Sequence, residues 1–244
     1  MKETINKFIE ALKDQESLFG DATYEKEGFK KIDLEFEAPA EINGMDIMKE
    51  EAKHVNLSGI KSLKELNKNM LECHNCPLGK TRKNLVFGSG NENADVMVIG
   101  EAPGAEEDLQ GLPFVGRAGK LLTDILKAIN FSRDDVYITN TVKCRPPGNR
   151  NPLPEEMSAC YPYLEKQIEI IKPKAILCLG LVAASGVLRL KTSLSQMRGN
   201  VYDVAGAKAM VTYHPAALLR NPQWKRGAWE DVQKFRKLYD DMVK

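Results

Sequence analysis

Cysteine spacing is the strongest chemical signal in this chain of 244 residues. Cys73 and Cys76 form a C-x2-C pair, and Cys144 and Cys160 follow far downstream with 15 residues between them. The stretch between the last two is rich in proline, as a loop wrapped around a metal centre would be. Four thiolates fit a tetrahedral zinc ion and equally a [4Fe–4S] cluster. The spacing does not choose between these groups, and four unrelated thiols remain the alternative.

The fifth cysteine, Cys178, lies inside the apolar run ILCLG and is expected to be a buried core thiol. An odd number of cysteines argues against a closed disulfide framework and favours metal binding or catalysis in a reducing compartment. No apolar run approaches the roughly 20 residues that span a membrane, and the charged N-terminus does not resemble a secretory signal. We therefore expect a cytoplasmic protein with no membrane partner. We also expect it to be a monomer.

A second set of chemically useful residues follows four short apolar runs. The runs and the residues that end them are Val96–Ile99 with Gly100 and Glu101, Val136–Thr139 with Asn140, Ala175–Leu179 with Gly180, and Met210–Thr212 with Tyr213 and His214. Short apolar runs that end at turn residues indicate buried strands. Ligands bind at the carboxyl ends of the strands in an open α/β sheet, so these residues are expected to share one site.

Such a site would combine an acid, an aromatic ring, an amide and an imidazole, which suits a flat polar ring. Phe114, in a loop after the first strand, offers a stacking face. Asn140 places a hydrogen-bond donor and an acceptor in one plane, which suits the edge of a pyrimidine. His214 can donate a hydrogen bond to an oxygen that gains negative charge. The alternatives are an ordinary strand–loop–helix corner and a histidine that only caps or packs.

Helical patterns separate the strands and must position their ends. Apolar residues recur at helical spacing over 118–130, 154–171 and 181–190, and a last helix is predicted over 227–243. Strands that alternate with helices imply βαβ units and a parallel sheet. We predict an α/β fold, a three-layer α/β/α sandwich with a central four-stranded parallel sheet.

Residues 1–60 differ from the rest of the chain in charge. They hold 14 acidic and 8 basic residues, whereas the remainder holds 20 acidic and 27 basic residues. A short helix is predicted over 4–13 and a polar, poorly periodic tether over 14–58. We predict an acidic, mostly irregular or helical N-terminal extension over 1–60 and a globular domain over 61–244. The extension is expected to pack on the surface or to bind a protein partner, and the basic domain suits a polyanion.

Four stretches together resemble one known family. They are GEAPG (100–104), PFVG (113–116), TNTVKCRPP (139–147) and HPAAL (214–218). In this order, and with the cysteine spacing, they resemble the family 4 uracil-DNA glycosylases, the iron–sulfur members of the uracil-DNA glycosylase superfamily. The resemblance covers about residues 62–243 and leaves residues 1–60 outside the family pattern.

The resemblance implies an enzyme of base excision repair that acts on uracil-containing DNA. Such an enzyme flips deoxyuridine out of the DNA, hydrolyses its N-glycosidic bond, releases uracil and leaves an abasic site. No lysine in the pocket motifs is an obvious Schiff-base nucleophile, so a monofunctional glycosylase is expected. A related branch links to DNA through a histidine in an inserted basic loop, and the stretch KCRPPGNRNP has none.

The resemblance also assigns roles to single residues. A structural [4Fe–4S] cluster would be ligated by Cys73, Cys76, Cys144 and Cys160. The uracil pocket would include Gly100, Ala102, Phe114 and Asn140. Phe114 would stack on uracil, and Asn140 would read its O4 and N3 edge. His214 would be catalytic, because it would donate a hydrogen bond to O2 of the departing uracil anion.

DNA contacts follow from the same resemblance. Leu218 matches the wedge position of the motif HPxxL, in an expected loop, and would fill the gap left by the flipped base. Basic side chains around the cysteine loop and after the histidine motif would meet phosphates. They are Lys143, Arg145, Arg150 and Arg220.

Activation of the attacking water is the one role that the motifs do not supply. In the better-known branch of the superfamily an aspartate stands where this chain has Ala102. Glu101 is the nearest carboxylate and is our choice for positioning water, with Glu107 and Asp108 as alternatives. An oxocarbenium-like sugar accepts even weakly activated water. Ala102 also keeps two rival functions open, a non-catalytic uracil-DNA sensor and an interaction protein recruited through residues 1–60.

Overall fold

The computed structural model describes residues 55–244. The helix predicted over 4–13 and most of the tether predicted over 14–58 lie outside the described residues. Leu57 and Ile60, just before the predicted start of the globular domain, pack with its core. No helix in this described part of the chain combines the length and the apolar composition of a membrane span.

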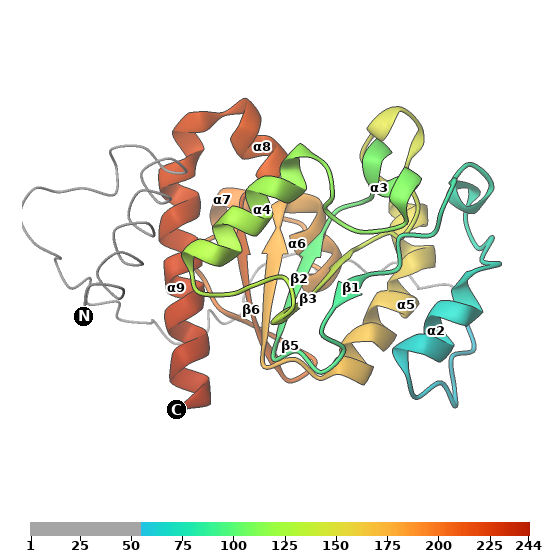
Figure 1. The fold of residues 1–244 in the computed structure, drawn as a ribbon, viewed down its shortest axis with the longest axis horizontal. Helices are drawn as coiled ribbons and strands as arrows, with labels where there is room; N and C mark the ends of the chain where they lie inside the picture. The colour runs from blue at the N-terminus through green and yellow to red at the C-terminus, as the bar shows by residue number, and fades with distance from the viewer. Residues whose placement is uncertain (1–54) are drawn as a thin grey trace, which may run out of the picture.

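One six-stranded sheet forms the centre of the described chain, in the order β1-β3-β2-β4-β6-β5 (Figure 1). The strands are β1 (Ser89–Gly90), β2 (Val96–Gly100), β3 (Val136–Asn140), β4 (Ala175–Leu179), β5 (Tyr202–Val204) and β6 (Ala207–Thr212). The central strands β3, β2, β4 and β6 run parallel, which confirms the predicted four-stranded parallel sheet. The edge strands β1 and β5 pair antiparallel and extend that prediction.

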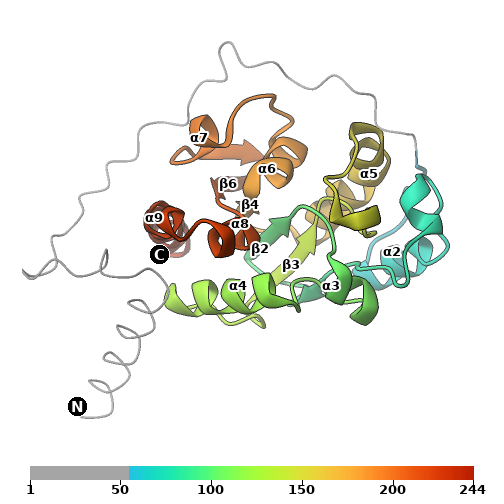
Figure 2. The ribbon, with the colours of Figure 1, turned by 90° about the horizontal axis from the view of Figure 1, so that it is seen from above.

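Helices cover both faces of the sheet, which confirms the three-layer α/β/α sandwich (Figure 2). One face carries α4 (Arg117–Ala128), α8 (Pro215–Arg220) and α9 (Lys225–Val243), and the other carries α5 (Pro154–Ile171), α6 (Gly180–Leu188) and α7 (Leu194–Met197). Helix α2 (Leu63–Met70) packs on α5, and α3 (Ala105–Gln110) follows β2. The four longer helices predicted from apolar spacing correspond to α4, α5, α6 and α9.

The central strands are buried on both faces, which explains why their sequences are continuously apolar. In β2 the side chains of Met97 and Ile99 belong to the core beneath α5 and α6, whereas Val96 and Val98 belong to the core beneath α4 and α9. All residues of β2 are buried. The alternation fixes the position of the strand, because a shift by one residue would exchange the two sets of side chains.

The strand register brings the carboxyl ends of the parallel strands to one edge. Gly100 of β2 pairs with Asn140 of β3, and Leu179 of β4 pairs with Thr212 of β6. The chain leaves β2 and β6 at this same edge, toward α3 and α8 (Figure 1). The backbone N–H of Thr141 donates to the Gly100 carbonyl at 2.8 Å, which holds the first two strand ends together.

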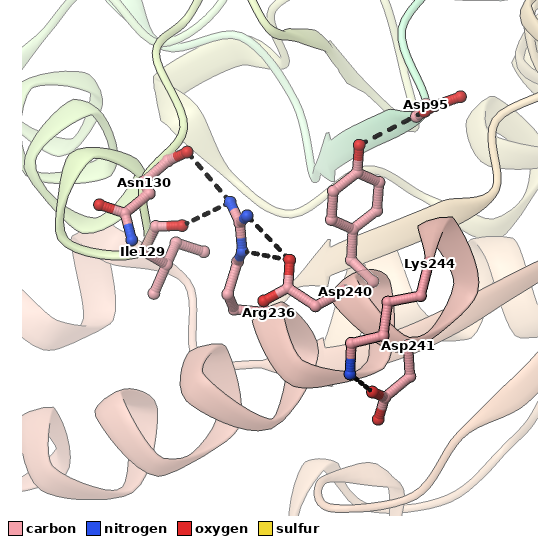
Figure 3. A network of polar contacts seen from close by, with 8 residues as sticks. Asp95, Ile129, Asn130, Arg236, Asp240, Asp241 and Lys244 are labelled. Carbon is pink, nitrogen blue, oxygen red and sulfur yellow. Dashed lines mark hydrogen bonds and ion pairs between the residues drawn. The ribbon is translucent and has the colours of Figure 1, made fainter.

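Helix α9 is tied both to the end of α4 and to the amino end of β2 (Figure 3). Arg236 Nη1 donates to the carbonyl oxygen of Asn130 at 3.0 Å, and Arg236 Nη2 pairs with Asp240 at 2.8 Å. The Tyr239 hydroxyl donates to the Asp95 carboxylate at 3.3 Å. These contacts hold α9 on the face that also carries α8, the helix that begins directly after His214.

Candidate active site

A cavity lies over the carboxyl ends of the parallel strands. The residues singled out from the sequence that line it are Glu101, Ala102, Glu107, Phe114, Asn140, Arg150, His214 and Arg220. Gly100 lies beside the cavity, directly against Phe114 and Asn140. The polar residues that follow the four strands therefore converge, as the sheet topology predicts.

Asn140 presents an unused acceptor at this cavity. Its side chain is 1% exposed, and its Oδ1 is a buried oxygen that has no hydrogen-bond partner among residues 55–244. Burying a polar atom without a partner is costly, so Oδ1 is best explained as the acceptor for a ligand N–H. Gly100 makes this packing possible, because a Cβ there would overlap the Phe114 ring and lie 2.5 Å from Asn140 Oδ1.

The Phe114 ring is held in place by its own strained backbone and by two neighbours. Phe114 has a φ of +54°, in the left-handed region that non-glycine residues rarely adopt. Arg133 donates to the carbonyl oxygens of Phe114 at 3.2 Å and Pro113 at 2.8 Å. At Gly119 a Cβ would overlap the Phe114 carbonyl, so only glycine lets α4 pack this closely. The Phe114 ring lies 5.6 Å from the His214 ring, tilted by 32°.

The protonation state of His214 follows from its position before α8. Its Nδ1 accepts a hydrogen bond from the Ala216 N–H at 3.2 Å, so the side chain caps the helix. Because Nδ1 is an acceptor, the proton of the neutral ring lies on Nε2. Burial lowers the pKa of His214 to about 4, and the nearby charge of Arg220 adds to this effect. At neutral pH His214 is therefore an uncharged hydrogen-bond donor.

The three candidate carboxylates have different surroundings. Glu107 accepts hydrogen bonds from the backbone N–H groups of Gly104, Val115 and Gly116 at 3.1, 2.9 and 3.0 Å, so it joins the two loops that follow β2. Asp108 is buried and accepts from the backbone N–H of Lys83 at 2.9 Å, away from the cavity. The sequence did not predict these structural roles.

Glu101, the first choice of the sequence analysis for positioning water, lies at the cavity, as does Glu107. It is half-buried, and it lines the cavity beside Ala102. Burial raises the pKa of the Glu101 carboxyl, and the positive charge of Arg220 opposes this rise. A carboxylate in such surroundings is less well solvated than one at the surface and is a stronger hydrogen-bond acceptor for a water molecule.

The predicted DNA-binding arginines differ in how free their side chains are. Arg220 is exposed at the end of α8, on the rim of the cavity. Arg145 is half-buried, and its Nε donates to Asn149 Oδ1 at 2.8 Å. Arg150 donates to both carboxylate oxygens of the buried Glu156 at 2.7 and 2.8 Å. This pair fixes the start of α5, so part of the Arg150 guanidinium is already occupied.

Two residues lie in surroundings that do not fit their predicted DNA contacts. Leu218 is 1% exposed and packs in the core beneath α4, because the expected loop is the helix α8 and turns this side chain inward. The next residue, Leu219, is 46% exposed. Lys143 is 0% exposed and binds Asn140, Thr139 and Gln167 inside the protein, so it does not reach phosphates.

An aromatic stack borders the cavity next to His214, and sequence reasoning did not find it. The Tyr213 ring lies 5.1 Å from the Trp224 ring and 3.9 Å from the Arg198 guanidinium. Asp231 accepts a hydrogen bond from Arg198 at 2.7 Å. Tyr213 and Trp224 both line the cavity. The one sequence signal for this stack is Tyr213, the aromatic residue next to the histidine motif. Its partners Trp224 and Arg198 lie outside that motif, so the sequence did not connect them to it.

The four predicted cysteine ligands gather at the side of the molecule formed by α2 and α5. Cys144 and Cys160 are buried, Cys73 and Cys76 are half-buried, and none forms a disulfide. Burial raises the pKa of the Cys160 thiol to about 12; Lys143 lowers it, whereas Cys144 and Cys76 raise it further. The thiols therefore lie close enough to sense one another's charge.

Cys178 lies in the core, and Cys144 accepts a hydrogen bond from an arginine. Cys178 is 0% exposed in β4, which confirms the predicted core thiol. Arg82 Nη1 donates to Cys144 Sγ at 3.2 Å, and this hydrogen bond opposes the rise in the Cys144 pKa that burial causes. Across residues 55–244, no three His, Cys, Asp or Glu side chains are grouped so as to hold a single metal ion.

Known proteins resemble this chain over the part that builds the cavity. The sequence model of the Uracil DNA glycosylase superfamily matches residues 87–233. The type-4 uracil-DNA glycosylase of Archaeoglobus fulgidus is 46% identical over 187 residues, which cover 73% of this chain and 94% of that protein. The type-4 uracil-DNA glycosylase of Thermotoga maritima is 47% identical and covers 68% of this chain and 88% of its own length.

A more distant relative marks the limits of the similarity. The type-5 uracil-DNA glycosylase of Pyrobaculum aerophilum is 37% identical over 146 residues, or 53% of this chain, whereas the type-4 protein of the same organism is 47% identical over 72% of it. Identity and coverage are therefore both higher for the type-4 proteins. The chain belongs to the uracil-DNA glycosylase superfamily, in its type-4 branch.

Proposed function

We propose that this protein is a monofunctional uracil-DNA glycosylase of base excision repair. The reaction adds water across the N-glycosidic bond of deoxyuridine, so that uracil leaves and an abasic sugar remains in the DNA. The observation that carries the proposal is the buried Asn140 Oδ1, which has no partner within residues 55–244 and lies beside the Phe114 ring and the His214 donor. These groups complement a flat ring with a hydrogen-bonding edge and a carbonyl that gains charge.

Discrimination between uracil and cytosine follows from the amide of Asn140. Uracil offers an N3–H donor to the vacant Oδ1 and an O4 acceptor to the Nδ2 donor of the same amide. Cytosine reverses both groups at this edge, with an N3 acceptor and an N4 amino donor. Sites that must hydrogen-bond their substrate reject an analogue with the wrong groups by about 10⁴–10⁵-fold, because buried polar atoms then stay unpaired.

The departing base is stabilised without a proton transfer. As the glycosidic bond breaks, negative charge builds on O2 of uracil, and the Nε2–H of neutral His214 can donate to that oxygen. The donor is fixed beforehand, because the opposite ring nitrogen is bound to the Ala216 N–H. A preorganised donor of this kind typically contributes about 10²–10³-fold to the rate. The Phe114 ring supports the base by stacking.

Glu101 is our proposed group for positioning the attacking water. Glu101 and Glu107 both line the cavity, but the Glu107 carboxylate is held by three backbone N–H groups, and Asp108 lies away from the cavity. Ala102 offers no carboxylate. An oxocarbenium-like sugar needs only weak assistance to accept water, so a single partly buried acid is sufficient. The electron pair of the broken bond leaves with uracil, and water supplies the hydroxyl on the sugar and one proton.

Contacts to DNA and to other proteins complete the proposal. Arg220 and Arg145 would meet phosphates beside the cavity, and the unoccupied part of the Arg150 guanidinium would add to them. The enzyme would act as a monomer, and residues 1–60 would bind a protein partner. A non-catalytic sensor is not favoured, because Phe114, Asn140 and His214 are all in place and the type-4 relatives are named as glycosylases.

Strand nicking tests the proposed function. A labelled oligonucleotide with one uracil is incubated with the full chain and then treated with alkali, which cleaves at an abasic site. We expect a nicked product that requires both the protein and the alkali, with none from the same oligonucleotide containing cytosine. Nicking before alkali would contradict a monofunctional enzyme. Tight binding of the uracil strand without any nicking would favour the sensor.

We further propose that Cys73, Cys76, Cys144 and Cys160 hold a [4Fe–4S] cluster. The four cysteines form no disulfide, and the charges of Cys76 and Cys144 act on Cys160 while those of Cys73 and Cys76 act on Cys144. The hydrogen bond from the charged Arg82 to Cys144 Sγ suits a thiolate. The spacing also allows a zinc ion, and the resemblance of the chain to the iron–sulfur family of uracil-DNA glycosylases favours the cluster. When bound, the cluster supplies a structural cross-link between the C-x2-C segment, the loop after β3 and α5.

Removing one ligand is expected to remove the cluster. The Cys144→Ala protein, purified without oxygen, should lose the broad visible absorption of an iron–sulfur centre and should melt about 10 °C lower, because the binding free energy of the cluster is part of the folding free energy. The matched control is Cys178→Ala, which removes a buried thiol away from the group and should keep the colour. Equal iron content and colour in both variants would contradict the ligand assignment.

A further inference from the structure

A buried lysine lies between the base-reading residue and the cysteine group. Lys143 follows Asn140 by three positions and precedes Cys144 directly. Its side chain is 0% exposed, although lysine is almost never fully buried unless it is paired. The reaction described above uses no group on Lys143. Its burial therefore calls for another explanation.

Three acceptors surround the Lys143 ammonium at short distances. Nζ donates to the backbone carbonyl of Asn140 at 2.6 Å, to Thr139 Oγ1 at 2.7 Å and to Gln167 Oε1 at 2.6 Å. Burial lowers the pKa of Lys143 to about 7, but the three acceptors match the three N–H donors of an ammonium, whereas a neutral amine has only two. Hydrogen bonds from a charged donor are roughly twice as strong as neutral ones. The carbonyl of Asn140, at the last position of β3, is thus held by a strong contact.

The same acceptors connect β3 to α5. Gln167 lies on α5, the helix that carries Cys160, and its Nε2 donates to the Phe87 carbonyl at 3.0 Å. The Thr139 hydroxyl donates to the same carbonyl at 2.9 Å. The Lys143 carbonyl accepts from the Val86 N–H at 2.9 Å. Lys143 therefore joins the end of β3, the segment before β1 and α5 into one buried network.

The Asn140 side chain depends on this network for its direction. Its Oδ1 has no hydrogen-bond partner of its own in the described structure, so side-chain contacts to that atom do not fix the amide. The backbone on which it stands is fixed on one side by pairing with Gly100 and on the other by the Lys143 ammonium. A small rotation of this backbone would move Oδ1 away from a bound base.

We propose that Lys143 is a positioning residue for base recognition, which holds the Asn140 backbone against α5 and so aims the Asn140 amide at the base. The inference rests on the proposed function, in which Asn140 reads uracil. It predicts a defect in binding the base and no defect in binding the DNA backbone. If Lys143 only stabilised the fold, its substitution would weaken binding of the base and binding of the DNA backbone by the same factor.

Two binding measurements on Lys143→Met separate these roles. Methionine has a similar length but no charge and no donor. In the full-length protein, with the visible absorption checked first, we expect the inhibition constant of free uracil to rise about tenfold or more, the effect of losing one charged hydrogen bond. The Kd for an oligonucleotide with a stable abasic-site analogue, which has no base to read, should stay within about twofold of the wild-type value.

Matched variants guard against a general loss of structure. Lys174→Met removes a half-exposed lysine that pairs with Asp95 at 3.0 Å, and it should change neither constant. Thr139→Val leaves the ammonium in place but removes one of its acceptors, and it should raise the uracil inhibition constant by a smaller factor in the same direction. It also keeps the inference testable if Lys143→Met does not fold.

The outcomes for this inference and for the proposed function are distinct. An unchanged uracil inhibition constant in folded Lys143→Met would overturn the positioning role, as would equal weakening of uracil and abasic-DNA binding. If Lys143→Met does not fold, an unchanged constant in Thr139→Val would do the same. Failure of the wild-type protein to excise uracil would instead overturn the proposed function itself.

Discussion

Replacing His214 with asparagine is expected to lower the rate of uracil excision by about 10²–10³-fold while leaving the fold intact. The substitution removes the Nε2–H that would stabilise the charge on O2 of the departing base. Asparagine is among the best N-cap residues, so the Ala216 N–H keeps an acceptor at the start of α8. Single-turnover rates on a uracil oligonucleotide measure the chemical step apart from product release.

His214→Ala separates catalysis from helix capping. Alanine removes both the donor and the cap, so the rate should fall as far as in His214→Asn, and about 1 kcal/mol of stability should be lost as well. The visible absorption should persist in both variants, because the cysteine group lies elsewhere. A wild-type rate in His214→Asn would show that the imidazole contributes only a cap and that the donor has been assigned to the wrong residue.

The pH dependence follows from the same buried imidazole. Burial lowers the pKa of His214 to about 4, so the rate of the wild-type protein should show no break near the ordinary histidine pKa of about 6.5. Between these two values the unfolded chain binds a proton that the folded chain does not. Stability should therefore fall as the pH decreases from about 6.5 towards 4. The His214→Asn protein should not show the part of this loss of stability that comes from protonation of His214.

The fold was predictable where the local pattern and the tertiary packing agree. The strands of the parallel centre are short apolar runs that end at glycine or a polar residue, and α5 spans the residues that apolar spacing predicted. The edge strands β1 and β5 contain only two and three residues, too few to show a period. Helix α8 was predicted as a loop, because proline and two alanines carry little apolar signal, although Pro215 suits the first turn of a helix.

The site was predictable to the extent that it sits at strand ends. The sheet topology alone brought Glu101, Asn140 and His214 to one cavity. Residues that act through distant partners could not be found in this way. Lys143 lies in a motif with charged neighbours, and its burial depends on acceptors on β3 and on α5, 24 residues further along the chain. The burial of Leu218 could not be predicted for a similar reason, because only the structure shows that its segment is helical.

Only a short stretch of chain joins the cavity to the cysteine group. Asn140 ends β3, and Cys144 follows four residues later. In between, the backbone N–H groups of Thr141 and Val142 donate to the carbonyls of Gly100 and Glu101 at 2.8 and 3.1 Å. A displacement of the cysteine loop would therefore reach the pocket through these backbone contacts. Through these contacts the proposed cluster would influence the pocket without touching the base.

Replacing Asn140 with leucine is expected to lower the catalytic efficiency on uracil DNA by about 10²–10³-fold, because two hydrogen bonds to the base are lost in a buried site. Leucine has nearly the same shape, so the Phe114 ring and the Gly100 backbone should keep their places. The substitution also removes Oδ1, which has no hydrogen-bond partner in the described part of the chain and is costly to bury when no ligand is bound. The free protein should therefore be as stable as the wild type or more stable, in contrast to most core substitutions.

This opposite response of stability and activity makes the Asn140 variant the sharper test of the site. Thermal melting and excision of uracil are measured on the same preparation, with Asn200→Leu as the control, because Asn200 lies outside the cavity and its Nδ2 donates to the Gln196 carbonyl. The control should retain wild-type activity. A large loss of stability in Asn140→Leu would show that the amide has a structural partner after all, and unchanged activity would mean that uracil is read elsewhere. Greater stability with lost activity would identify Asn140 Oδ1 as an atom whose burial without a partner serves recognition of the base.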